Sequence, residues 1–196
     1  MRLQGRREFP LTERGRLQAE ALADRLSGQE VVAVYASPIR RATDTAEAIA
    51  ARLGLTVQPE PRVQEFDFGE ALSGLTWPEI QEKRPELVQA LLANAEEFPH
   101  YPGEEGRDKF RQRVCEAMTE IAEGRQGNEA VAVVTHAGPI VVFLLETLGR
   151  AYRRPIPFTV DNASVATVEF NRQAPPGFPR AVVVGINDTC HLRAQR

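Results

Sequence analysis

The chain contains little lysine and little cysteine. Of its 24 basic residues, only Lys83 and Lys109 are lysines, and we attribute this preference for arginine to genomic base composition. Its 2 cysteines, Cys115 and Cys190, lie far apart in the sequence. This spacing excludes a disulfide framework and fits a reducing compartment.

Histidine is also scarce, and sequence motifs for common cofactors are missing. The three histidines, His100, His136 and His191, have no metal-ligand spacing among themselves or with the cysteines. There is no P-loop lysine motif and no GxSxG nucleophile elbow. We therefore expect no metal site and no cofactor.

Long apolar runs are absent as well. No run approaches the length of a membrane span, and the residues after Met1 are polar, unlike a signal peptide. The net charge of −3 and the sequence pI of about 5.7 imply no bulk attraction to nucleic acid or to a membrane. These features predict a soluble, cytoplasmic protein without nucleic-acid or membrane partners.

What the sequence does contain is an alternation of helical and strand patterns along 196 residues, which predicts one domain over residues 1–196. Thr12 is expected to cap a first helix whose apolar side carries Leu17 and Leu22 and which Gly28 ends. The apolar run Val31–Ala36 predicts a buried strand. A second helix with Ala42, Ala46, Ile49 and Leu53 at helical spacing follows, and then a short strand at residues 56–58.

The middle of the chain has a different pattern. Residues 62–75 are expected to form a loop, and a helical insert is expected at about residues 70–105. Within it, Thr76-Trp-Pro-Glu79 is a capping-box pattern with proline in the first turn. A long amphipathic helix through Phe110 and Ile121 should follow and end at Gly124.

The run Ala130–Val134 is apolar on both faces, as in a central strand of a parallel sheet. A helix at about residues 139–148 follows it, and residues 164–170 and 181–186 predict two late strands joined by a hairpin-like loop. The order predicts an α/β fold with a mostly parallel sheet and helices on both faces, a three-layer sandwich. Ligands of such sheets bind at the carboxyl ends of the strands.

Two strand-to-helix turns are therefore candidate sites. After the strand 31–36, Arg41 lies near a helix N-terminus, where free N–H groups and a guanidinium both favour an anion such as phosphate. After the strand 130–134, His136 precedes Gly138, which allows a ligand close to the backbone. Taken singly, a solvated arginine or a structural histidine explains each residue as well.

A carboxylic acid could complete such a site. Glu65 lies in the expected loop, and it could protonate a leaving oxygen if burial raises its pKa. Asp67 competes with it for this role. A surface position remains the simpler explanation for any single glutamate.

Several motifs, taken in order, resemble the histidine phosphatase superfamily, the phosphoglycerate mutase-like group. The resemblance covers nearly the whole chain. The matching stretches are Arg2-Leu-Gln-Gly5, Pro10-Leu-Thr-Glu-Arg-Gly15, Tyr35-Ala-Ser-Pro-Ile-Arg-Arg-Ala42, Val63-Gln-Glu65, Pro102-Gly-Glu-Glu105 with Arg113, and Val133-Val-Thr-His-Ala-Gly138.

The resemblance implies a metal-independent phosphomonoesterase that works through a phosphohistidine intermediate on a small phosphorylated substrate. It implies Glu65 as the proton donor, Arg41 as a phosphate-binding arginine, and His136 as both a phosphate-binding and a catalytic histidine. Gln4 and Gly5 would lie at the substrate entrance. A homodimer is a further partner that the sequence leaves open.

One departure from the family concerns its nucleophile, which lies in an RHG motif after a first, central strand. Neither the strand nor the motif occurs upstream of Arg2, so we expect that the recorded start codon lies too late. Two alternatives stay open: a catalytically inactive protein that binds phosphate esters, and a mutase-type phosphotransferase. The absence of a long insert with an arginine pair favours the phosphatase.

Overall fold

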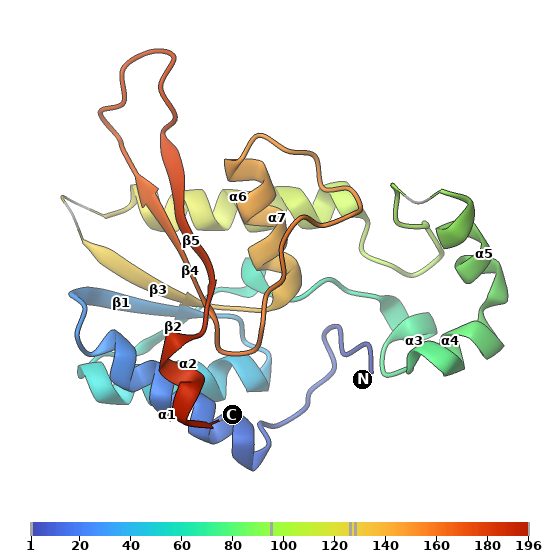
Figure 1. Ribbon diagram of the computed structural model, residues 1–196, viewed down its shortest axis with the longest axis horizontal. Coiled ribbons are helices and arrows are strands. Elements are labelled where there is room, and N and C mark those ends of the chain that lie inside the picture. The colour runs from blue at the N-terminus through green and yellow to red at the C-terminus, as the bar shows by residue number, and fades with distance from the viewer. Residues whose placement is uncertain (1, 95, 126, 128, 196) are drawn as a thin grey trace.

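The computed structural model describes residues 2–94, 96–125, 127 and 129–195 and has the expected alternation of helices and strands (Figure 1). Its first half contains α1 (Glu13–Leu26), β1 (Val31–Ala36), α2 (Arg40–Leu53), β2 (Val57–Pro59) and the 3-10 helix η1 (Pro61–Val63). Its second half contains α6 (Arg107–Glu123), β3 (Ala130–Val134), α7 (Ala137–Thr147), β4 (Val165–Phe170), β5 (Ala181–Asp188) and the 3-10 helix η2 (Cys190–Gln195).

The ends of the early helices follow from local sequence. The side chain of Thr12 accepts a hydrogen bond from the amide of Gly15 at the start of α1, as expected of an N-cap. Gly54 ends α2 in the left-handed conformation, at φ 68°. Leu17 was wrongly assigned to the apolar side of α1: it is 48% exposed, and α1 buries Leu22 and its neighbours instead.

The three strands β2, β1 and β3 pair in that order, and all are parallel. In Figure 1 this sheet lies between α1 and α2 on one face and α6 and α7 on the other, so the predicted α/β architecture is confirmed. The core beneath β1 consists of apolar side chains from α1, β1 and α2, among them Leu22, Val34 and Ile49. This packing fixes the carboxyl ends of β1 and β3 at one edge.

One sequence expectation about this sheet is wrong: in the described part of the chain, β3 is an edge strand, not a central one. Its only hydrogen-bonded neighbour there is β1. Val131, Ala132, Val133 and Val134 consequently remain partly exposed although their apolar sequence suits burial on both faces. The apolar side chains of β3 are therefore only partly covered by the rest of the protein.

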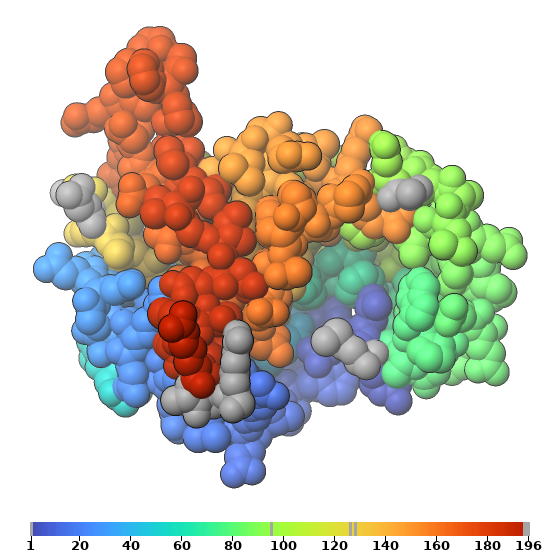
Figure 2. Space-filling model, in the orientation of Figure 1, coloured from blue at the N-terminus to red at the C-terminus, as the bar shows by residue number. Residues whose placement is uncertain are grey.

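The last two strands form a separate antiparallel pair, which agrees with the expected hairpin-like loop between them. β4 and β5 pair through Val168 and Val183, and Phe170 stacks on Phe143 of α7 with ring centroids 6.3 Å apart. The outer half of this hairpin projects beyond the rest of the molecule (Figures 1 and 2). No hydrogen-bonded ladder joins the pair to β3 among the described residues.

The middle of the chain forms three short helices at the side of the molecule away from that hairpin (Figure 1). They are α3 (Gly69–Leu72), α4 (Trp77–Lys83) and α5 (Pro85–Ala93). The capping box of Thr76 and Glu79 is present. The expected loop at 62–75 is wrong in part, because it contains η1 and α3; Leu72 of α3 is buried and stabilises this turn.

No helix within the described residues combines the length and the apolar surface that crossing a bilayer requires.

Candidate active site

A cavity of about 1480 Å³ runs between β3 and β4 and reaches the carboxyl ends of β1 and β3. Arg41, Glu65 and His136, which are remote in sequence, all line it. Gln4 and Gly5 line it as well. These five residues from the sequence analysis therefore line one cavity. Arg41 and His136 meet there because β1 and β3 are parallel and end at the same edge of the sheet.

Arg41 is the second residue of α2, and its guanidinium is turned toward the N-terminal loop. It donates hydrogen bonds to the carbonyl oxygens of Gly5, at 2.8 Å, and Arg7, at 3.0 Å. Burial lowers the pKa of Arg41, and the nearby carboxylates of Glu65 and Glu8 partly oppose this. Arg41 therefore holds the loop that contains Gln4 and Gly5 against the cavity.

Glu65 lies two residues after η1 and is partly buried. Its Oε1 accepts the amide of Phe66 at 2.8 Å, and its Oε2 accepts the amide of Gly138 at 3.2 Å. Burial raises the pKa of this carboxyl group, while the two amides and the charges of Arg41 and Arg113 act to lower it. Desolvation is the largest effect, so the environment favours the protonated acid.

His136 is the N-cap residue of α7 and is 8% exposed. Its Nε2 lies 2.8 Å from Oγ of Ser37, a buried residue at the end of β1. Burial lowers the pKa of His136 to about 3, and the positive charges of Arg41 and Arg113 add to the effect. The imidazole is therefore neutral at pH 7, and Ser37 fixes its orientation.

Gly138, the second residue of α7, lies against the carboxyl group of Glu65. A Cβ atom at this position would lie 2.1 Å from Oε1 of Glu65 and 3.2 Å from Cζ of Phe110. The missing side chain is what allows the carboxyl group to reach the start of α7.

Asp67, the competitor of Glu65, lies in a different setting. Its side chain is 40% exposed; Oδ1 accepts the amide of Gly69, and Oδ2 lies 3.8 Å from the guanidinium of Arg6. Asp67 is not among the described residues that line the cavity. Its contacts suit a loop-stabilising role.

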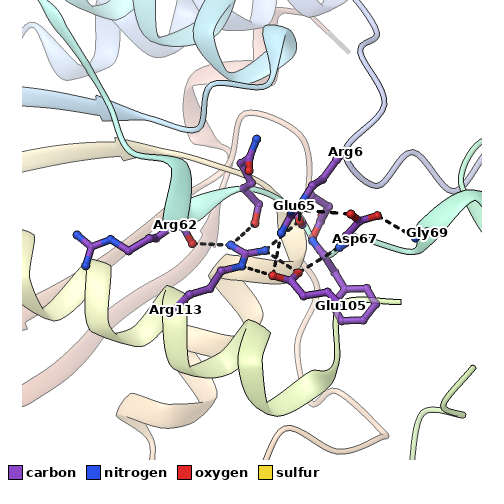
Figure 3. Close-up of polar contacts among 9 residues, drawn as sticks. Arg6, Arg62, Glu65, Asp67, Gly69, Glu105 and Arg113 are labelled. Atoms are coloured by element: carbon purple, nitrogen blue, oxygen red, sulfur yellow. Dashed lines mark hydrogen bonds and ion pairs between the residues drawn. The ribbon is translucent and has the colours of Figure 1, made fainter. Parts of the chain in front are cut away.

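Sequence reasoning assigned no role to Ser37, which contacts His136, or to Glu105 and Arg113, which bind each other beside Glu65. Figure 3 shows the contacts of Glu105 and Arg113. Ser37 follows β1 directly and is fully buried. The sequence feature that could have identified Ser37 is its position at the carboxyl end of β1, because β1 lies next to β3, the strand that precedes His136. Glu105 and Arg113 are far from Glu65 in sequence, and no local pattern connects them to it.

The remaining histidines lie elsewhere. His100 contacts Glu104, and His191 contacts Arg25 and the carbonyl of Ala163. Among the described residues, no three histidine, cysteine, aspartate or glutamate side chains are grouped so that they could hold a metal ion. The ionisable groups at the cavity edge are an arginine, a carboxylic acid and a neutral histidine, a set suited to binding and protonating a phosphate ester.

Comparison with known proteins adds an independent finding. The model of the histidine phosphatase superfamily, branch 1, matches residues 1–176. A metal-independent phosphoserine phosphatase of Arabidopsis thaliana is 40% identical over 194 residues, which are 97% of this chain and 76% of the relative. Phosphoserine phosphatase 1 of Hydrogenobacter thermophilus is 33% identical and covers 97% of this chain and 86% of the relative.

The fold is similar to that of a mycobacterial glucosyl-3-phosphoglycerate phosphatase in complex with inorganic phosphate. The TM-score is 0.80 at 27% identity, and the match covers 97% of this chain and 93% of the other.

Proposed function

The chain belongs to the histidine phosphatase superfamily, and we propose that it is a metal-independent phosphomonoesterase that works through a phosphohistidine intermediate. The observation that carries the proposal is the convergence of Arg41, Glu65 and His136 on one cavity. The names of its relatives support a phosphatase, and phosphoserine is the first substrate to test.

The three side chains suit different parts of the reaction. Arg41 donates to the phosphoryl oxygens, which gain charge in the transition state, and neutral His136 donates to them through Nδ1 while its Nε2 accepts from Ser37. A histidine nitrogen attacks phosphorus, the ester P–O bond breaks, and the acid form of Glu65 gives its proton to the leaving oxygen. Glu65, now a carboxylate, then takes a proton from the water that attacks the phosphohistidine, which releases phosphate and regenerates the histidine.

The nucleophile is the part that the described residues do not supply. Of the three histidines, only His136 lines the cavity in the described part of the chain, and its Nε2 is engaged by Ser37. We assign the nucleophile to a segment of the native protein that precedes Arg2, as the RHG motif of the family does.

The cavity supports this assignment because its lining is suited to a further β-strand between β3 and β4. All residues of β3 and all residues of β4 line it, and neither strand has a partner on that side among the described residues. A strand placed there, parallel to β3, would join the two sheets and cover Val131–Val134. Its carboxyl end would lie beside His136, where β3 also ends, so the residue after it would face the phosphate.

The experiment begins with the DNA immediately upstream of the codon for Met1. Translated in frame, it should encode an apolar strand followed by Arg-His-Gly. The extended protein should hydrolyse phosphoserine and p-nitrophenyl phosphate without metal and form an acid-labile phosphoenzyme, and the 196-residue chain should not. An in-frame stop codon just before Met1 would contradict the missing-strand assignment.

The leaving group tests the role of Glu65. Glu65→Gln should slow hydrolysis of phosphoserine by about 10²–10⁴-fold, since its alkoxide needs a proton, and slow p-nitrophenyl phosphate much less. Asp67→Asn is the matched control and should leave the ratio of the two rates unchanged. If Asp67→Asn slowed phosphoserine hydrolysis selectively and Glu65→Gln did not, Asp67 would be the proton donor.

A second candidate function rests on the same observation about the histidines. If the native protein has no further histidine at the cavity, it binds phosphate esters without turnover. Phosphoserine or vanadate would then raise the melting temperature of the 196-residue chain with no release of phosphate.

A mutase would instead return the phosphoryl group to a second hydroxyl of the substrate, which product analysis distinguishes from hydrolysis.

A further inference from the structure

The guanidinium of Arg113 is one of the most fully bonded groups near the cavity. Arg113 projects from α6 and is 14% exposed. Its hydrogen-bond acceptors are the carbonyl oxygens of Arg62, Gln64 and Glu65, at 2.5 to 3.1 Å, and both carboxylate oxygens of Glu105, at 2.5 and 2.8 Å. A guanidinium has five N–H groups, so this set of acceptors uses all of them.

Glu105 completes the arrangement from the other side (Figure 3). Its carboxylate is 4% exposed and also accepts the amide of Asp67 at 3.2 Å and a guanidinium N–H of Arg6 at 2.8 Å. The amide of Glu105 donates to the carbonyl of Asp67 at 3.0 Å. The positive charges of Arg113 and Arg6 hold the pKa of Glu105 below its ordinary value despite burial.

Several of these bonds end on the backbone that carries Glu65. The carbonyls of residues 62, 64 and 65 are bound by Arg113, and the amide of residue 67 is bound by Glu105. The segment has little regular structure of its own, because η1 ends at Val63 and α3 begins at Gly69. Its position therefore depends on the ion pair more than on a helix or strand.

We propose that Arg113 and Glu105 act together as a positioning pair that sets the place of the Glu65 carboxyl group at the cavity. The proposal rests on the proposed function for its catalytic consequence, but the placement itself can be measured without turnover. The pair does not contact the substrate: all donors of Arg113 are occupied by protein groups, and Glu105 is buried behind the segment.

The geometry calls for arginine in particular. Only a planar guanidinium can bind a carboxylate through two parallel bonds and still direct three N–H groups at carbonyls. A lysine would keep the charge but offers three donors from one nitrogen atom, so most of the carbonyl contacts would be lost. Arg113→Lys therefore separates placement from charge.

The decisive measurement is NMR titration of the Glu65 carboxyl carbon in the 196-residue chain labelled with ¹³C-glutamate, with Glu65→Gln to assign the signal. Arg113→Lys and Glu105→Gln should each shift the resonance of Glu65 and change its titration midpoint. In protein that hydrolyses phosphoserine, Arg113→Lys should lower kcat by about 100-fold with little change in KM, as for a catalytic group displaced by about 1 Å.

Arg111→Lys is the matched control, because Arg111 lies on the same helix, is 43% exposed and pairs with Glu146. It should leave the Glu65 signal and kcat unchanged. Thermal melts identify any variant that does not fold; if Arg113→Lys is one, the isosteric Glu105→Gln carries the test. Folded variants that melt earlier but keep the Glu65 titration and kcat of the parent protein would overturn the proposal and leave the pair a purely structural role.

Discussion

Gly138→Ala is the substitution whose effect the structure defines best. The added methyl carbon would lie 2.1 Å from Oε1 of Glu65, whereas ordinary contact begins at 3.4 Å, so the carboxylate must retreat by the difference, about 1.3 Å. Phe110, at 3.2 Å, limits relaxation on the other side. A group displaced by about 1 Å from its productive position loses on the order of 10² in rate.

The same overlap should destabilise the fold. Overpacking costs about 1–3 kcal/mol, and loss of the bond from the Gly138 amide to Glu65 adds about 1 kcal/mol. The better helix propensity of alanine offsets up to about 1 kcal/mol, because Gly138 lies in α7. A net cost of about 2 kcal/mol corresponds to a decrease in melting temperature of roughly 4–8 °C for a chain of this size.

Thermal melts monitored by circular dichroism measure the loss of stability, and phosphoserine hydrolysis by the extended protein measures the loss of rate. Gly185→Ala is the matched control, since a Cβ atom there would meet nothing within 4 Å. The control should change stability by less than about 0.5 kcal/mol. If Gly138→Ala melts and turns over like the control, Glu65 does not lie against the start of α7, and the reasoning about the site fails.

Two further predictions concern His136. The pKa of His136 in the folded chain, about 3, lies below its ordinary value of 6.5, so the unfolded chain binds the extra proton between these pH values. The free energy of unfolding should therefore fall as pH falls from about 6.5 to 3, by an upper limit of about 4–5 kcal/mol. His136→Gln should flatten this part of the pH profile of stability measured by urea denaturation. Equal slopes for the two proteins would contradict the argument that His136 is buried. Ser37→Ala should destabilise the chain by about 1–3 kcal/mol, because it leaves the buried Nε2 of His136 without its partner, whereas Ser27→Ala at the exposed end of α1 should change urea denaturation little.

Local sequence was sufficient for most of the elements. The cap at Thr12, the capping box at Thr76 and the apolar run Val31–Ala36 predicted helix starts and a strand that the structure contains. Each of these signals depends on residues within one turn or one strand, so no distant contact is needed to interpret it. The order of the motifs also predicted that Arg41, Glu65 and His136 belong to one site, because each follows or adjoins a strand or turn of a recognisable family pattern.

Other features depended on contacts between residues far apart in the chain. The exposure of Leu17 and the short helix α3 inside an expected loop were decided by which surfaces the neighbouring elements cover. The same is true of the edge position of β3, whose apolar sequence is suited to a strand with neighbours on both sides. Hydrophobic pattern records what a segment can bury, but not what lies beside it.

The sequence by itself determined the family, the alternation of helices and strands, and the residue types at the site, because these depend on local patterns and on motif order. Only the tertiary structure decided that Ser37 holds His136, that Gly138 makes room for Glu65, and that Arg113 and Glu105 bind the backbone around it. Hydrogen bonds and burial act between groups within a few ångströms in space, and sequence separation does not encode those distances.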